Sequence, residues 1–129
     1  MADVEFRTSG SSGEAKAIVR SGESLDADAR AIVAAFPEVW GACRRVVATI
    51  PRDHMFGALW RIRAPAIAGC DSPEETVVSV EGLVAACVEG DVLLATTPSF
   101  LEKALEHPGF ASLKGKIAAV VVSGSPLRE

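Results

Sequence analysis

Asp91-Val92-Leu93-Leu94-Ala95-Thr96 is a short, continuous apolar run near the middle of the second half of the chain. Such a run is typical of a strand that is buried on both faces. Two further runs of the same kind lie at residues 45–50 and 117–123. Because segments with helical spacing separate the three runs, they predict an α/β fold in which helices flank the layers of a parallel sheet.

Four helices are expected around these strands. The first is expected to run from an N-cap at Ser24 to an exit at Pro37, since its apolar residues recur at helical spacing. A second should end or kink at Pro65, which has no backbone N–H to donate. Pro73 is expected to open a third that runs to about Cys87, and a fourth should follow the central strand.

The bulk composition is that of an ordinary folded domain. The 129 residues are 49% hydrophobic and 23% charged, which is enough apolar material for one core, and a single domain over residues 1–129 is expected. A net charge of −4 and the absence of tyrosine argue against a nucleic-acid-binding surface. The apolar runs are too short to span a membrane and no secretory signal is visible, so a cytoplasmic protein is expected.

Three cysteines are spread widely along the chain, at Cys43, Cys70 and Cys87. Their number is odd and no Cys-x-x-Cys pair occurs, so the sequence predicts neither a metal site nor a disulfide framework. Reduced thiols inside the core are the expected state. Trp40 and Trp60 are likewise expected in the core.

A loop rich in glycine and serine lies between two strand-like segments near the start of the chain, and it is expected to form the tip of a short β-hairpin. Its glycines allow close backbone approach, and its N–H and hydroxyl groups can hold an anion. Lys16 at its end can neutralise a phosphate. From the residues alone, a flexible hairpin tip without a ligand is the alternative. The loop reads Thr8-Ser9-Gly10-Ser11-Ser12-Gly13-Glu14-Ala15-Lys16.

This loop resembles the signature of the AMP-forming adenylating superfamily, which is roughly Thr-Ser-Gly-Ser/Thr-Ser/Thr-Gly-x-Pro-Lys. Eight of the nine positions agree, and Ala15 stands where the family has proline. Further segments resemble family motifs and follow in the family's order. These are Pro51-Arg52-Asp53-His54-Met55-Phe56-Gly57, residues 64–69, residues 93–101 and Ser123-Gly124-Ser125-Pro126-Leu127.

The resemblance implies a partial domain of the adenylating-enzyme fold. It implies an ATP-dependent acyl- or aryl-acid ligase that activates a carboxylic acid as acyl-AMP for transfer to CoA or an acyl carrier protein. ATP and Mg²⁺ are the implied cofactors. Since complete members of the family are several times longer, we expect a central fragment of the N-terminal domain that is inactive by itself. The alternatives are a non-catalytic nucleotide- or anion-binding module and an inactive truncated remnant.

The resemblance also assigns roles to single residues. It implies catalytic roles for Lys16, on the phosphates, and for His54, at the acyl pocket, with Gly57 giving room beside it. From the residues alone, a structural loop histidine is the simpler interpretation of His54. The implied nucleotide contacts are the phosphate loop and a segment beside the adenine, namely Thr8, Ser9, Gly10, Ser11, Ser12, Gly13, Lys16, Ser123, Gly124, Ser125 and Pro126.

Overall fold

The central element of the fold is a parallel sheet of three strands. The computed structural model describes residues 3–9 and 15–123. Within them the sheet has the strand order β3-β4-β5, and both pairs of neighbouring strands are parallel. The strands are β3 (Arg45–Ala48), β4 (Val92–Thr96) and β5 (Ile117–Val122). The predicted α/β fold with a parallel sheet is therefore confirmed.

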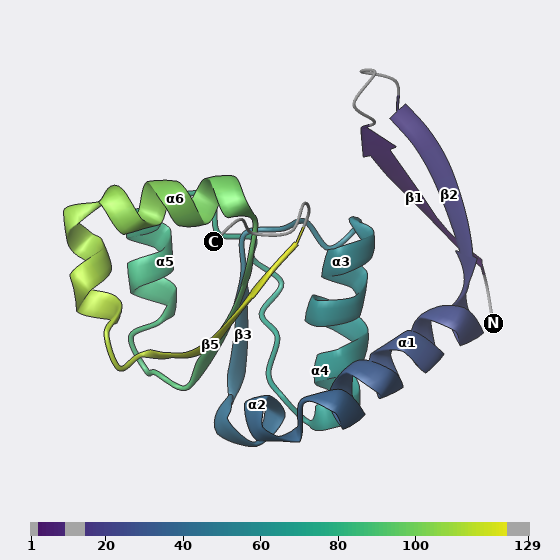
Figure 1. Cartoon of the computed structure of the whole chain (residues 1–129), viewed down its shortest axis with the longest axis horizontal. Helices are drawn as coiled ribbons and strands as arrows, with labels where there is room; N and C mark the ends of the chain where they lie inside the picture. Colours follow the sequence, from purple (N-terminus) through teal and green to yellow (C-terminus); the bar gives the residue numbers. More distant parts are fainter. Residues whose placement is uncertain (1–2, 10–14, 124–129) are drawn as a thin grey trace.

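Helices cover both faces of this sheet, so the molecule has three layers (Figure 1). On one face lie α1 (Gly22–Ala35), α2 (Pro37–Ala42) and a continuous helical segment from Met55 to Ala68. On the other face lie α5 (Val80–Ala86), α6 (Pro98–Glu106) and the 3₁₀-helix η2 (Pro108–Leu113).

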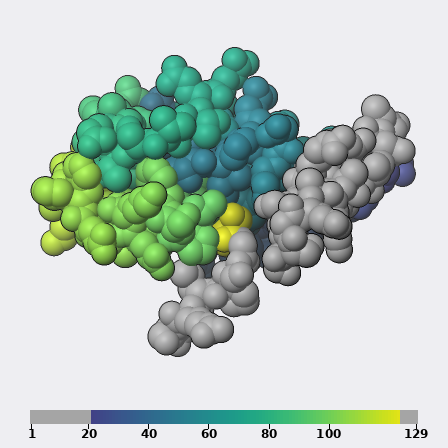
Figure 2. Space-filling model, turned by 90° about the horizontal axis from the view of Figure 1, so that it is seen from above, coloured from purple at the N-terminus to yellow at the C-terminus, as the bar shows by residue number. Residues whose placement is uncertain are grey.

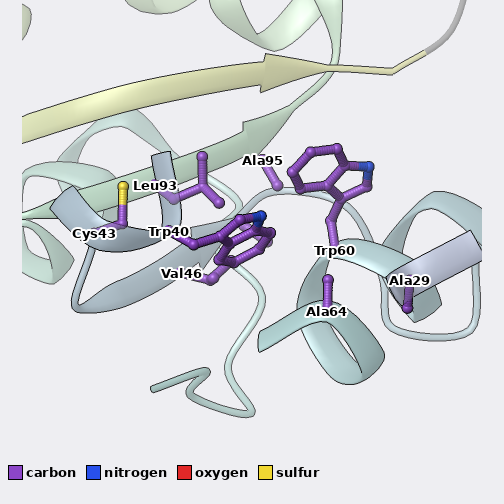
Figure 3. Packing of buried hydrophobic residues seen from close by; sticks show 9 residues of the cluster. Ala29, Trp40, Cys43, Val46, Trp60, Ala64, Leu93 and Ala95 are labelled. Atoms are coloured by element: carbon purple, nitrogen blue, oxygen red, sulfur yellow. The ribbon is translucent and has the colours of Figure 1, made fainter. Parts of the chain in front are cut away.

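The core is divided into two clusters by the alternation of side chains along β4. Leu93 and Ala95 pack with Trp40 and Trp60 on the face that carries α1 and α2 (Figure 3). Val92 and Leu94, which point to the opposite face, pack with residues of α5 and η2. Both tryptophans are buried, as the sequence predicts.

The first helix begins earlier than expected. Ser21, and not Ser24, is the N-cap of α1, because the Ser21 hydroxyl accepts a hydrogen bond from the Ser24 amide at 3.0 Å. The predicted exit is close to correct, since α1 ends at Ala35. Pro37, however, does not simply terminate the helix; it occupies the first turn of α2, where its missing N–H costs nothing.

The second helix, which was expected to end or kink at Pro65, continues past the proline. A π-helical turn precedes the proline, and the Ala64 amide bonds to the carbonyl of Leu59, five residues back. Pro65 thereby falls in a new first turn, and the helix ends only at Gly69, whose φ is 75°. The three parts are α3 (Met55–Gly57), η1 (Ala58–Arg63) and α4 (Ala64–Ala68).

The third predicted helix is wrong at its start. Pro73 opens no helix, and α5 begins only after the N-cap Ser79. The reason lies in the Arg61 guanidinium, which donates to the carbonyls of Pro73, Glu74 and Glu75 at 3.2, 3.0 and 2.9 Å. In a helix these carbonyls would accept from amides four residues ahead, so their use by Arg61 holds the segment extended.

Candidate functional site

The carboxyl ends of the three parallel strands form one edge of the sheet, which is where open α/β sheets bind ligands. Hydrogen bonds join these ends. The hydroxyl oxygens of Thr49, after β3, and Thr96, at the end of β4, are 2.8 Å apart. The Ser123 amide, after β5, donates to the Thr96 carbonyl at 2.9 Å. The yellow end of β5 reaches the surface between the green α6 region and teal-blue residues (Figure 2).

His54 lies in the loop that leaves β3 at this edge. Its side chain is exposed and forms the N-cap of α3, since Nδ1 accepts a hydrogen bond from the Phe56 amide at 3.2 Å. Its backbone amide donates to the Pro51 carbonyl at 3.2 Å, which closes the turn. Because Nδ1 accepts, the neutral imidazole carries its proton on Nε2. The capping bond fixes the ring through the Phe56 amide rather than through the neighbouring Asp53.

Gly57 is required by close backbone packing. A Cβ added at Gly57 would lie 2.1 Å from the carbonyl oxygen of Pro51, far inside van der Waals contact. The missing side chain therefore lets α3 pack directly against the turn that carries His54. The space beside Gly57 is filled by this turn, so Gly57 affects the position of His54 through backbone contact with the turn.

An apolar pocket of about 320 Å³ lies between the helical layer and β5. Its walls are Phe36, Val39, Phe56, Trp60 and residues 119–122. Phe56 is two residues from His54, and residue 122 directly precedes Ser123. The wall residues are all of apolar type, so the pocket can accept the hydrocarbon part of a ligand and offers no charged side chain as a partner.

Arg61 is a buried cation to which the sequence alone assigned no role. Its side chain is only 3% exposed, and Nη1 donates to the Ile50 carbonyl at 2.9 Å and to the Thr76 hydroxyl at 2.6 Å. Burial, and to a smaller extent the charge of Arg52, lowers the pKa of Arg61. Arg61 thus fastens the carboxyl end of β3 to the extended segment before α5. A helical stretch that is apolar apart from Arg61 and Arg63 was the available signal, and it does not distinguish the buried arginine from the other.

The two ends of the predicted phosphate loop lie side by side. β1 (Asp3–Ser9) and β2 (Ala15–Ser21) are antiparallel, and their register pairs Thr8 with Lys16 and Ser9 with Ala15. The other predicted nucleotide contacts lie outside the described residues, namely Gly10, Ser11, Ser12, Gly13, Gly124, Ser125 and Pro126.

The cysteines offer no reactive thiol at neutral pH. All three are free, and Cys43 and Cys87 are buried in the two core clusters. Burial, with smaller effects of Cys43 and Asp71, raises the pKa of the Cys70 thiol to about 11. Within the described ranges, no group of three His, Cys, Asp or Glu side chains is placed to hold a metal ion. None of the described helices has the length and apolar character needed to span a membrane.

Comparisons with known proteins show what this chain is similar to. No family model matches the chain. A 4-coumarate-CoA ligase from Cereibacter sphaeroides is 29% identical over 124 residues, which are 94% of this chain and 28% of the ligase. The crystal structure of ATP-bound MatB from Rhodopseudomonas palustris superposes with a TM-score of 0.75 at 17% identity. An ATP-bound chimera of RpMatB and BxBclM gives a TM-score of 0.77 at 16% identity.

The chain is a partial homologue of the 4-coumarate-CoA ligase, and it shares its fold with a portion of the two solved structures. It spans about a quarter of the length of the proteins it matches: 95% of this chain aligns with 24% of each of the two solved chains. The α/β layers described above match that portion of the adenylating-enzyme fold. Both solved relatives are ATP-bound, whereas the roles of individual residues in this chain remain predictions.

Proposed function

We propose that this chain supplies the phosphate loop and the acid-binding pocket of an ATP-dependent acyl- or aryl-acid ligase. In the proposed reaction a carboxylate oxygen attacks the α-phosphorus of ATP, the bond to the bridging oxygen breaks, and pyrophosphate leaves. The acyl-AMP then passes its acyl group to the thiol of CoA or of a carrier protein. The single observation that supports this best is an apolar pocket lined by Phe56, which is two residues from His54, and by the last residues of β5, in a fold that is shared with ATP-bound enzymes.

The acid would enter the pocket with its hydrocarbon part first. The uniformly apolar walls favour an aliphatic or aromatic group, and the aromatic rings of Phe56 and Trp60, 5.8 Å apart, favour an aromatic one. The carboxylate would remain near His54, where the Nε2 proton can be donated to an oxygen of the acid or of the acyl-AMP. His54 is therefore proposed to orient the acid for attack.

ATP would be held by the loop between β1 and β2. Developing negative charge on phosphate oxygens needs preorganised donors, and the loop supplies amides, hydroxyls and Lys16. The pairing of Thr8 with Lys16 supports this role, because it brings the loop's terminal cation next to its first hydroxyl-bearing residue in the backbone register. Mg²⁺ is proposed to arrive with the nucleotide and to neutralise its phosphates.

Acid-dependent exchange of labelled pyrophosphate into ATP tests the proposal. A full-length ligase that contains these 129 residues should catalyse exchange with aromatic or aliphatic acids, and Lys16→Met in that ligase should lower the rate at least about 10-fold, since a charge-assisted hydrogen bond to phosphate is lost. Lys114→Met, which changes an exposed lysine on η2's C-cap, serves as the matched control. Exchange that is equal in wild type and Lys16→Met would refute the assignment of Lys16.

Two alternatives predict different results. A non-catalytic nucleotide-binding module, for which the same loop is the supporting observation, would bind MgATP in calorimetry without any exchange. An inactive remnant would neither bind MgATP nor catalyse exchange. It should also melt in a broad transition, whereas small intact domains usually unfold cooperatively. The two parallel strand pairs and the two core clusters favour a cooperative melt.

A further inference from the structure

A second cavity, of about 270 Å³, lies where β3 and β4 end, on the face of the sheet that carries α5 and α6 (Figure 1). None of its described wall residues is shared with the apolar pocket. Its chemistry also differs from that of the apolar pocket, because most of its described walls carry a hydroxyl or an ammonium group and none carries a carboxylate. These polar wall residues are Thr49, Ser79, Thr97, Ser99 and Lys103.

Lys103 is the one charged residue among the described walls of this cavity. It follows Ser99 by four residues on α6, so helical spacing places the two side chains on the same face of the helix. Lys103 is exposed and forms no ion pair within the described ranges. The Glu81 carboxylate, in the first turn of α5, is bonded to His107 and Ser79 instead. The ammonium group is therefore available to a ligand.

The hydroxyl groups of the cavity can act as donors to such a ligand. The Thr97 oxygen accepts from the Phe100 amide at 3.3 Å and lies 3.3 Å from the Ser99 oxygen, so at most one of the two hydroxyl protons is used between them. Thr49 and Thr96 likewise share one proton across 2.8 Å, and Thr96 is fully buried whereas Thr49 lines the cavity. Hydroxyl protons from both strand ends can thus reach one acceptor group.

We propose that this cavity binds the phosphate group of a small phosphate ester. A phosphate monoester has three terminal oxygens and nearly two negative charges at neutral pH, which suit one ammonium group and several hydroxyl donors. A carboxylate has only two oxygens and one charge, so it suits them less well. The cavity is smaller than the roughly 300 Å³ at which pockets for drug-sized ligands begin, so the ester is small. Its carbon part would contact the apolar wall residues, which are Val78, Val80 and Phe100.

Titration of the labelled chain with n-propyl phosphate, followed by amide NMR at about pH 7.5 and constant ionic strength, tests this proposal. The amides of Thr97, Ser99 and Phe100 should shift together and saturate. Lys103→Met keeps a good helix former and should weaken binding about 5- to 10-fold, because a hydrogen bond to a charged group is lost. Ser99→Ala should weaken it about 3-fold, and the amide spectrum of each variant checks that it is folded.

Lys114→Met is the matched control, because Lys114 is exposed and is not among the walls of this cavity, and it should leave the affinity unchanged. n-Butyrate, which carries a carboxylate on the same propyl group, should bind at least about 10-fold more weakly. Equal affinities for the two ligands, or an affinity that does not depend on Lys103, would overturn the proposal. A loss confined to Lys16→Met would also overturn it, because the phosphate would then be bound by the loop proposed for ATP, and the proposed function would stand.

Discussion

Arg61 holds a buried positive charge that no carboxylate neutralises among the described residues; its partners are backbone carbonyls and one hydroxyl. These carbonyls belong to Ile50 and to residues 73–75, which lie on opposite sides of Arg61 in the sequence. A guanidinium suits this task because it presents several donors in a fixed plane. The sequence shows only that an arginine is present, since the acceptors become neighbours only after folding.

Replacing Arg61 by leucine should lower the free energy of unfolding by about 3 kcal/mol, because several buried carbonyls lose their charged donor together. Urea denaturation followed by circular dichroism would measure the change. Arg30→Leu, at an exposed position of α1, is the control and should change stability by no more than about 0.5 kcal/mol. A loss at Arg61 no larger than the loss at Arg30 would show that the network contributes little.

Two glycines give a second matched test. Gly57→Ala places a Cβ 2.1 Å from the Pro51 carbonyl oxygen, so the turn that carries His54 must move, at a cost of about 2 kcal/mol. Gly41→Ala places a Cβ on α2 with no atom within 4 Å, and it should stabilise the protein by about 0.5–1 kcal/mol. Thermal unfolding of both variants checks the opposite signs. If both variants melted alike, close packing at Gly57 would be disproved.

Helices and strands differ in how much of them the sequence could predict. The three strands were predicted because each is a local apolar run, which needs no knowledge of its neighbours. The start of α5 was not predicted correctly. The extended segment before it is held by Arg61, which lies twelve or more residues away in the chain. The helix through Pro65 was expected, with an end or a kink at the proline, but no local pattern signals the π-helical turn that accommodates the proline.

The candidate site also has parts that the sequence could predict and a part that it could not. His54 and the phosphate loop could be found because their residues are contiguous and resemble a family motif. The apolar pocket could not, because its walls come from three distant segments that meet at β5. Trp60 was therefore interpreted only as a core residue, although it both packs in the core and lines the pocket.

A side-chain hydrogen bond joins α5 to the end of α6. The Glu81 carboxylate lies 2.9 Å from His107 Nε2, and His107 also caps η2 by accepting from the Gly109 amide. A hydrogen bond from the Glu81 amide and then the bond with His107 lower the pKa of Glu81 below its ordinary value of 4.5. A carboxyl with a lowered pKa contributes stability above its unfolded pKa and loses it as the pH falls through the folded value.

Glu81→Gln should therefore destabilise the protein slightly at pH 6, and the difference from wild type should shrink as the pH falls below 4.5. The effect will be small because Glu81 is exposed to solvent. Urea midpoints of the two proteins between pH 3 and about 7 provide the measurement. A difference that grew on acidification would contradict a lowered pKa of Glu81 in the folded protein.

At the scale of the whole molecule, the carboxyl edge of the parallel sheet is the feature that relates the proposed functional residues to one another. The strand ends are tied together through Thr49, Thr96 and Ser123, His54 follows β3 at the same edge, and the apolar pocket is lined by the last four residues of β5. The chain nevertheless spans only about a quarter of the proteins it matches. Nucleotide binding by the Thr8–Lys16 loop is thus the proposal on which the ligase assignment depends most.

Amide NMR spectra of the labelled chain during titration with MgATP test this proposal most directly. The amides of residues 8–16 should shift together and saturate, because their N–H groups are proposed to donate to the nucleotide's terminal phosphates. Lys16→Met should weaken the binding about 10-fold or more, whereas Lys114→Met should leave it unchanged. Shifts that bypass residues 8–16, or an affinity that does not depend on Lys16, would contradict the assignment of this chain to ATP-dependent acid activation.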